Sequence, residues 1–246
     1  MPDTRTHRGP HPSDPKLFAP DVLPQLREAM ADYCWLLTRG YSSDAALKLV
    51  GDRFQLAARQ RMALVRGGCS HLASERRKTQ RVELEALRGR RVAVDGFNCL
   101  ITVEAALSGG VVLRAVDGSH KDLASVHGTY RHVSETEEAL NRLCATLSGQ
   151  NPEEVAWYLD SPVSNSGKLA TLMRNSFEAK GLDWSVELVK DADRAIQTSQ
   201  AVAASSDGWV MDEAAGWLDL AGATLLSAAP DAWVVDLRPR EELNVK

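Results

Sequence analysis

Aspartates follow four short apolar segments in the second half of the chain, at the points where buried strands would end. The segments run into Asp95, Asp160, Asp191 and Asp207. In a parallel α/β sheet, the side chains that bind ligands lie at the carboxyl ends of the strands. Carboxylates that meet at one edge repel one another unless a cation or a proton lies between them. The pattern therefore predicts a divalent metal site and indicates chemistry on phosphate groups.

The segment Asp95-Gly-Phe-Asn98 offers two side-chain oxygen ligands at a tight strand exit. Hard cations such as Mg²⁺ and Mn²⁺ prefer carboxylate and amide oxygens of this kind. Asp95 could equally cap a helix over residues 98–106. A helix cap and a metal ligand do not exclude each other, so both interpretations stay open.

Three further acids lie close to the later strand ends. Asp191 and Asp193 would begin one helix, and Asp212 would follow Asp207 by about one helical turn. Acids are also common in first helical turns because they interact favourably with the helix dipole. We expect Asp207 to lie in the crevice with Asp95; Asp191 and Asp193 are both candidate ligands from the neighbouring strand end, and Asp212 is an alternative to Asp207.

A polar loop after Asp160 is a candidate phosphate site. Ser164, Asn165 and Lys168 lie where this loop opens into a helix, and helix N-termini favour anions. The segment lacks the Gly-x-x-x-x-Gly-Lys-Ser/Thr pattern of a Walker loop. An ordinary polar turn with a serine cap and a solvated Lys168 would explain the same residues.

The elements that must position these residues change character along the chain. Helical spacing of apolar residues predicts helices over residues 20–39, 43–50, 57–66 and 74–87. Short apolar runs then predict strands at 92–94, 155–159, 186–189, 201–205, 223–227 and 233–237. Most are separated by expected helices at 135–147, 166–180, 193–200 and 210–220.

Strands that alternate with helices predict an α/β fold, a three-layer sandwich with a central, mainly parallel sheet, preceded by a small all-α module. We expect a disordered tail over residues 1–16, the helical module over 17–89 and the α/β domain over 90–246. Residues 108–132 fit neither period and predict an insertion or hairpin with one arm at 111–113. Four polar residues of this segment have two open interpretations, as solvated loop residues or as substrate contacts: Arg114, Asp122, His127 and Arg131.

Composition is that of an ordinary globular protein, with 44% apolar and 25% charged residues among 246. No apolar run approaches the roughly 20 residues of a membrane span. The N-terminus lacks the apolar segment of a signal peptide, so a cytoplasmic protein is expected. The four cysteines are far apart in sequence and are expected to be reduced and mostly buried.

The net charge of −4 conceals an asymmetry between the two halves. Residues 1–91 hold 17 basic and 10 acidic residues, or +7, and the remainder holds 12 and 23, or −11. Arginines of the basic half, including Arg59 and Arg61, could supply the phosphate contacts that an acidic domain lacks. They could instead be exposed or paired with acids of the other domain.

Four short segments, taken in order, resemble the PIN-like superfamily of metal-dependent ribonucleases, including its NYN branch. They read Val-Asp-Gly-x-Asn, Tyr-Leu-Asp, Asp-x-x-Ile and Ser-Ser-Asp, and the resemblance covers roughly residues 90–228. It implies an α/β sandwich whose acids bind Mg²⁺ or Mn²⁺ and cleave RNA. By this resemblance, Asp95 is the first-strand acid, Asp160 the second-strand acid of NYN-type members, Asp193 the acid before the fourth strand and Asp207 the acid of the Ser-Asp segment.

The chain departs from the superfamily pattern at two places. Asp207-Gly-Trp-Val-Met-Asp212 replaces the usual Asp-x-Asp-Phe ending, and Glu104 is the candidate for the helix-borne glutamate of many members. The N-terminal part is similar to the short helical domain that precedes a PIN-like domain in one prokaryotic family. The leading hypothesis is a metal-dependent ribonuclease with RNA as its partner. The alternative is a nucleic-acid-binding or regulatory protein of the same fold with little or no catalysis; a homo-oligomer is possible but has no support in the sequence.

Overall fold

The N-terminal part of the computed structural model is helical, and the structure describes residues 7–123 and 128–239. The hydroxyls of Ser42 and Ser70 cap two of its helices by accepting backbone N–H groups. The elements of this part are α1 (Asp14–Leu17), α2 (Leu23–Thr38), α3 (Ser43–Arg53), α4 (Ala58–Gly67), α5 (His71–Gln80) and the 3₁₀ turn η1 (Leu84–Leu87).

Two predicted helix boundaries in this part are wrong. The break expected at residues 51–52 is absent because Gly51 is a buried helical residue; a Cβ there would lie 2.2 Å from Nη1 of Arg61. The helix expected over 74–87 begins earlier, at the Ser70 cap, and ends at Gln80. The chain then extends, and the Val82 N–H donates to the Trp217 carbonyl at 2.8 Å.

A five-stranded parallel sheet forms the centre of the second part, in the order β5-β4-β1-β6-β7. Its strands are β1 (Arg91–Asp95), β4 (Glu154–Asp160), β5 (Ser185–Val189), β6 (Val202–Ala204) and β7 (Trp217–Leu218). Beyond Arg91, β1 is buried along its whole length, as expected for a central strand covered on both faces. The expected α/β class, with a parallel sheet and an N-terminal helical segment, is confirmed.

Helices cover both faces of this sheet. One face packs against α6 (Gly96–Leu107), α7 (Thr136–Ser148), α8 (Ser166–Ala179) and α11 (Leu220–Ala228). The other packs against α9 (Ala192–Ser199) and α10 (Gly208–Glu213). Trp157 of β4 is fully buried on the first face, with its ring centroid 5.7 Å from that of Phe177 in α8. These layers are consistent with a three-layer sandwich.

Two predictions near the C-terminus are wrong in type. The strand expected at residues 223–227 lies within α11, because the Asp219 carboxylate accepts the Gly222 N–H at 3.0 Å and starts a helix there. The helix expected over 210–220 ends at Glu213 and gives way to β7. Trp217 is fully buried in that strand, and its Nε1 donates to the Arg77 carbonyl at 2.7 Å.

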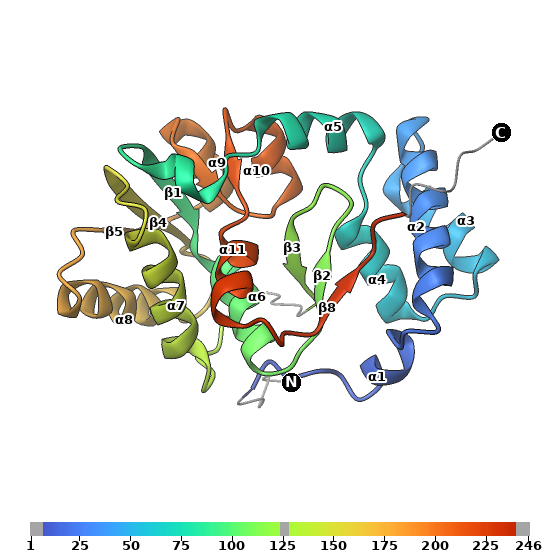
Figure 1. Ribbon diagram of the computed structural model, residues 1–246, viewed down its shortest axis with the longest axis horizontal. Coiled ribbons are helices and arrows are strands. Elements are labelled where there is room, and N and C mark those ends of the chain that lie inside the picture. The colour runs from blue at the N-terminus through green and yellow to red at the C-terminus, as the bar shows by residue number, and fades with distance from the viewer. Residues whose placement is uncertain (1–6, 124–127, 240–246) are drawn as a thin grey trace.

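A second, smaller sheet lies between the parallel sheet and the N-terminal helices, as Figure 1 shows. It consists of β2 (Val112–Arg114), β3 (His120–Asp122) and β8 (Val234–Asp236), in the order β3-β2-β8. The hairpin predicted within residues 108–132 is therefore present. The strand predicted at 233–237 exists but pairs with β2 rather than with an edge of the parallel sheet.

The N-terminal helices share one hydrophobic core with this small sheet. Leu26 and Met30 of α2 belong to the same buried cluster as Leu113 of β2 and Val235 of β8. The prediction of disorder is wrong for residues 7–16, because Asp14 is fully buried and ion-paired with Arg59. Residues 1–6, 240–246 and the predicted contact residue His127 lie outside the described residues.

No helix among the described residues is both long and apolar enough to cross a membrane. All four cysteines are free thiols, and three of them are buried, as the sequence predicts.

Candidate functional site

The sheet topology singles out one crevice, at the carboxyl ends of β1 and β6. These strands are neighbours, yet the helix after β1 covers one face of the sheet and the helix before β6 covers the other. Ligands of open α/β sheets bind at such topological switch points. Asp95 ends β1 here, and Ser205, Ser206 and Asp207 directly follow β6.

Asp95 is held at this crevice from two sides. Its Oδ1 accepts the Asn98 N–H at 3.1 Å and so caps α6, and its Oδ2 accepts the Ser205 hydroxyl at 3.0 Å. The Ser205 hydroxyl oxygen in turn accepts the Asp207 N–H at 3.0 Å. Asp95 is therefore a helix cap, as one interpretation of its sequence context predicts, and its carboxylate lies beside the segment after β6. Its role as a metal ligand stays a prediction.

Asn98 joins the two strand ends rather than pointing freely into the crevice. Its Oδ1 accepts both the backbone N–H and the hydroxyl of Ser206, each at 2.9 Å. The amide oxygen that the sequence offered as a ligand is thus already engaged in fixing the segment after β6. Asn98 acts here as a positioning residue.

Asp207 and Asp193 approach the crevice from helices on the second face of the sheet. Asp207 caps α10, because its Oδ1 accepts the N–H groups of Trp209 and Val210 at 2.8 and 3.2 Å. Asp193 lies in the first turn of α9, and no hydrogen bond fixes its carboxylate within the described part of the chain. It is the least restrained carboxylate at this edge.

Asp160 and Asp191 lie farther along the same edge. Asp160 ends β4, and its Oδ1 accepts the Ala192 N–H at 2.8 Å. Asp191 is exposed and caps α9 by accepting the Arg194 N–H at 2.9 Å. We define Asp95, Asp160, Asp191, Asp193 and Asp207 as the acidic edge.

The electrostatics of the acidic edge indicate uncompensated negative charge. Burial raises the pKa of Asp95 to about 7; hydrogen bonds from Asn98 and Ser205 oppose this rise, and repulsion from Asp193 and Asp207 adds to it. Burial raises the pKa of Asp193 to about 6, and repulsion from Asp207, Asp160 and Asp191 adds to it. No lysine or arginine is among the main influences on either group, so a proton or a cation is favoured here.

The carboxylate oxygens of the acidic edge are the type of ligand that a hard cation binds, but they do not converge on a single point. Carboxylate oxygens are the ligands that Mg²⁺ and Mn²⁺ prefer. Within residues 7–123 and 128–239, no three His, Cys, Asp or Glu side chains are arranged to hold one metal ion. Binding of a cation at the acidic edge therefore requires side-chain movement, for which Asp193 is the least restrained.

Asp212 is not part of the acidic edge. Its carboxylate pairs with Arg76 and Arg77, each at 2.8 Å, and these arginines lower its pKa against the effect of its partial burial. Arg77 also pairs with Asp117 at 2.8 Å and donates to the Gly208 carbonyl at 3.0 Å. Sequence reasoning missed this buried arginine, because its partners lie 40 and 135 residues away.

The loop after Asp160 is paired to the insertion instead of forming an open phosphate cradle. The Ser164 N–H donates to the Gly128 carbonyl at 3.0 Å, and the Asn165 side chain donates to the Tyr130 carbonyl at 2.9 Å. Asn165 adopts a left-handed conformation with φ of 68°. These contacts engage the Asn165 amide that the phosphate hypothesis offered and the Ser164 N–H, but not the Ser164 hydroxyl. Phosphate binding by this loop stays a prediction.

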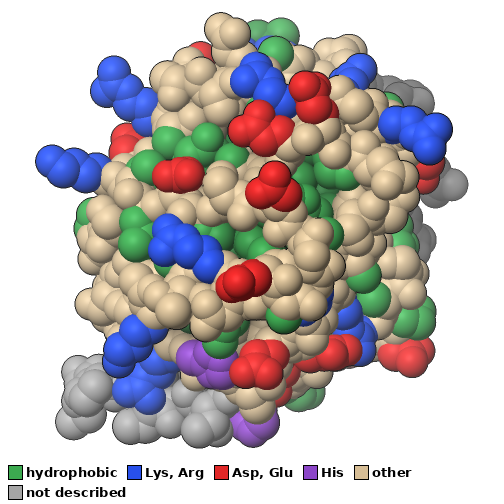
Figure 2. Space-filling model, turned by 90° about the vertical axis from the view of Figure 1, so that its left-hand side faces the viewer, with side chains coloured by type: hydrophobic (Ala, Val, Ile, Leu, Met, Phe, Trp, Pro, Cys, Tyr) green, Lys and Arg blue, Asp and Glu red, His purple; other side chains and the backbone are tan. Residues whose placement is uncertain are grey.

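Lys168 lines a surface groove of about 570 Å³ between α7 and α8, together with Glu137 and Asn141. Figure 2 views this end of the molecule and shows acidic and basic side chains interspersed, with hydrophobic side chains between them. The face in view therefore presents no continuous basic surface for a polyanion.

Arg59 and Arg61 are bound to acids of the helical part itself. Arg59 Nη2 donates to the buried Asp14 at 2.8 Å, and Arg61 Nη2 donates to Asp52 at 2.8 Å. Their proposed role in substrate binding is not supported, because ion pairs already occupy both guanidinium groups. The sequence left open pairing with acids of the other domain; Arg76 and Arg77 pair in that way with Asp212, whereas Arg59 and Arg61 pair within the N-terminal part.

Glu104 is also a structural residue. It is fully buried and accepts the Tyr130 hydroxyl at 2.6 Å, while Arg8 pairs with its other oxygen. The helix-borne glutamate expected from the resemblance is thus neutralised inside the fold. It does not face the acidic edge as a free carboxylate.

Two family models match separate parts of the chain. The family described as "Domain of unknown function (DUF5616)" matches residues 84–223, which contain all five strands of the parallel sheet. The family described as "Protein of unknown function (DUF434)" matches residues 25–80, which contain α3, α4, α5 and most of α2.

One relative among curated proteins aligns over most of both chains. The chain is 29% identical over 188 residues to "Uncharacterized protein MJ0935" of Methanocaldococcus jannaschii, which covers 76% of this chain and 90% of that protein. No solved structure matches the chain. Because the DUF5616 match spans more than half of its length, the chain belongs to the DUF5616 family.

Proposed function

We propose that this protein is a metal-dependent hydrolase of RNA phosphodiester bonds that acts in the cytoplasm through the acidic edge. One observation carries the proposal: carboxylates gather at the topological switch point of a parallel sheet without a compensating cation. The pKa values of about 7 for Asp95 and about 6 for Asp193 express that lack of compensation. Perturbed carboxylates of this kind are typical of functional sites.

Asp95, Asp160, Asp193 and Asp207 would hold Mg²⁺ or Mn²⁺, with Asp191 as an alternative ligand. A bound divalent cation stabilises negative charge on a phosphate and lowers the pKa of water. The chain's own contribution is orientation. Ser205 fixes Asp95, and Asn98 fixes Ser206, so that β1 and the segment after β6 keep their carboxylates on one edge.

The test compares Asp193→Asn with Asp183→Asn. Among the described residues, Asp193 makes no hydrogen bond that its replacement would break, and Asp183 is an exposed aspartate outside the acidic edge. Calorimetric titration with Mn²⁺ and cleavage of a labelled single-stranded RNA would be measured for both variants. We expect Asp193→Asn to lose Mn²⁺ binding and cleavage, while Asp183→Asn retains both. Equal activity of the two variants would refute the assignment.

A second candidate is a protein of this fold that binds nucleic acid without cleaving it. Two observations favour it: Asp212 is neutralised by two arginines, and the acidic edge holds no three carboxylates on one point among the described residues. RNA binding without turnover in saturating Mn²⁺ would support this candidate against the first. Cleavage that requires Asp193 would exclude it.

A further inference from the structure

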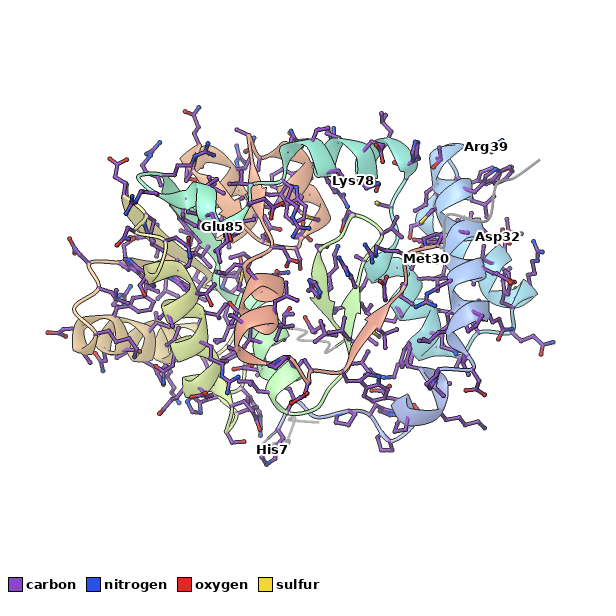
Figure 3. The ribbon with its side chains drawn as sticks, viewed as in Figure 1. His7, Met30, Asp32, Arg39, Lys78 and Glu85 are labelled. Atoms are coloured by element: carbon purple, nitrogen blue, oxygen red, sulfur yellow. The ribbon has the colours of Figure 1, made fainter. Side chains whose placement is uncertain are left out.

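A cleft of about 840 Å³ lies where the helical segment meets the small sheet, and its charged lining is predominantly basic. We call this cleft the basic cleft. Its basic side chains come from four separate parts of the fold: Arg27 from α2, Lys78 from α5 with Arg81 just after it, Arg114 from β2, and Arg238 from the segment after β8. Two acids, Asp117 and Asp236, also line it, so the count is five basic minus two acidic, or +3. Figure 3 labels Lys78 on α5, above the small sheet.

The two acids do not neutralise the centre of the basic cleft. Asp117 accepts Arg77 Nη1 at 2.8 Å and the Ser119 hydroxyl at 2.6 Å. Asp236 accepts Arg238 Nη2 at 2.6 Å and Nε at 3.0 Å. Arg77, the partner of Asp117, lies outside the lining, whereas Arg238, the partner of Asp236, lies within it. Lys78 pairs with Glu75 at 2.8 Å, so the bases of the lining without a hydrogen-bonded carboxylate partner among the described residues are Arg27, Arg81 and Arg114.

Two arginines of the basic cleft have buried donors without an acceptor. Nε of Arg114 and Nε of Arg81 are buried and have no hydrogen-bond partner among the residues that the structure describes. Glu83 approaches Arg81 Nε at 3.4 Å but lacks hydrogen-bond geometry, and its own side chain is 70% exposed. A buried arginine donor without an acceptor is costly in a folded protein unless a ligand supplies one.

Glycine keeps this space open. Gly118 forms the turn of the β2–β3 hairpin with φ of +88°, and a Cβ on it would lie 3.2 Å from Arg81 Nη1. A side chain there would both strain the turn and fill the space beside the guanidinium. The hairpin thus brings bare backbone against the cleft, as in sites where a ligand comes close to the main chain.

We propose that the basic cleft binds phosphate oxyanions. Arginine forks suit phosphate oxygens, and the volume lies in the range of ligand sites, about 300–1,000 Å³. The lining described by the structure holds no aromatic side chain; Val116 and Pro239 are its apolar members. Recognition therefore rests on the phosphate rather than on a base.

The basic cleft is separate from the acidic edge, and hydrogen bonds of Arg77 link the two. Arg77 contacts Asp117 of the cleft on one side and the Gly208 carbonyl, next to Asp207, on the other. Phosphate binding here does not depend on the proposed hydrolysis. Phosphate binding is therefore measured in EDTA, which removes divalent cations and stops metal-dependent hydrolysis. A loss of binding in EDTA counts against the basic cleft alone, whereas a loss of RNA cleavage in Mn²⁺ counts against the proposed hydrolase.

The experiment uses the full chain, with inorganic tripolyphosphate and a short single-stranded RNA as probes. Arg114→Gln removes a cleft charge whose buried Nε has no hydrogen-bond partner in the described structure, so we expect this variant to fold. Arg88→Gln removes an exposed charge outside the cleft and is the matched control. Affinity is measured by calorimetry, and thermal melting checks folding and ligand stabilisation.

We expect Arg114→Gln to weaken tripolyphosphate binding by roughly ten- to a hundredfold, the effect of losing a charge-assisted hydrogen bond. Tripolyphosphate should raise the melting temperature of the wild type and of Arg88→Gln more than that of Arg114→Gln. If RNA binds more tightly than tripolyphosphate, and Arg114→Gln reduces the slope of log affinity against log salt concentration by about 0.7, the phosphate that the cleft binds belongs to an RNA backbone. If tripolyphosphate binds and RNA does not, the source is a free phosphate anion. Equal affinities of Arg114→Gln and Arg88→Gln for both probes, or binding of neither probe to the wild type, would overturn the proposal.

Discussion

Replacing Asp95 by asparagine measures the free-energy cost of an ionised, buried carboxylate at the acidic edge when no cation is bound. Burial is the first cause of the rise in the pKa of Asp95 from 3.8 to about 7. Each pH unit between the folded and unfolded pKa is worth about 1.4 kcal/mol, so ionised Asp95 lowers the free energy of unfolding by about 4 kcal/mol. Asparagine loses the hydrogen bond from the Ser205 hydroxyl, which offsets about 1 kcal/mol. The expected net gain from Asp95→Asn above neutral pH is about 3 kcal/mol.

The sign of this effect depends on pH. Between pH 3.8 and about 7, folded Asp95 keeps its proton while the unfolded chain releases it. The unfolded state then binds fewer protons, so wild-type stability falls as pH rises through this window. Asp95→Asn removes that slope. The variant should be slightly less stable than the wild type near pH 4, by about 1 kcal/mol, and more stable at pH 8.

Urea unfolding at equilibrium, in EDTA and at several pH values from 4 to 8, measures this difference directly. Asp183→Asn is the control, because Asp183 is exposed and outside the acidic edge; its curves should parallel those of the wild type. A constant loss of stability in Asp95→Asn at every pH would refute the reasoning. It would mean that Asp95 acts only as the cap of α6.

Three further predictions concern the frame around the site. Arg77→Met should destabilise the protein by about 3–5 kcal/mol in urea unfolding, because it leaves Asp117 without its buried partner; Arg88→Met should have little effect. Trp157→Ala should lower the free energy of unfolding by about 3–5 kcal/mol in the same assay, because a fully buried indole is lost from the main core. Burial raises the pKa of the Cys34 and Cys144 thiols to about 12, so both should react with a thiol reagent at pH 8 only after urea is added; rapid labelling of the native chain would contradict this.

Much of the parallel sheet could be predicted because its information is local. Runs such as Val92–Val94 and Val155–Leu159 have the length and β-branched content of buried strands. The errors arise where a distant contact decides the structure. The apolar run after Asp219 resembles a strand, but the Asp219 cap makes it a helix. Trp217 lies in a segment of helical spacing, but its contact with the Arg77 carbonyl holds it in a strand.

The candidate site divides in the same way. The carboxyl ends of parallel strands must share one edge, so Asp95 and Asp207 could be placed from sequence alone. Residue spacing could not show that Ser206 donates a hydrogen bond to Asn98, or that Asp212 forms ion pairs with Arg76 and Arg77. Those outcomes depend on side chains that approach from other elements. Sequence therefore indicates which groups reach an edge but not which of them remain free there.

Charge counted along the chain does not show which basic side chains are already ion-paired. Within the helical part, Arg53, Arg59 and Arg61 are each bound to an acid of the same part. These local pairs use one acid for each arginine and leave the excess of +7 in residues 1–91 unchanged. Part of that excess meets acids of the second part, where Arg8 pairs with Glu104, Arg66 with Asp122, and Arg76 and Arg77 with Asp212. In the part of the chain that the structure describes, the arginines whose buried Nε has no hydrogen-bond acceptor are Arg81 and Arg114, one from each half. Because the small sheet packs against the N-terminal helices, the fold brings these two arginines into one cleft that neither half could form alone.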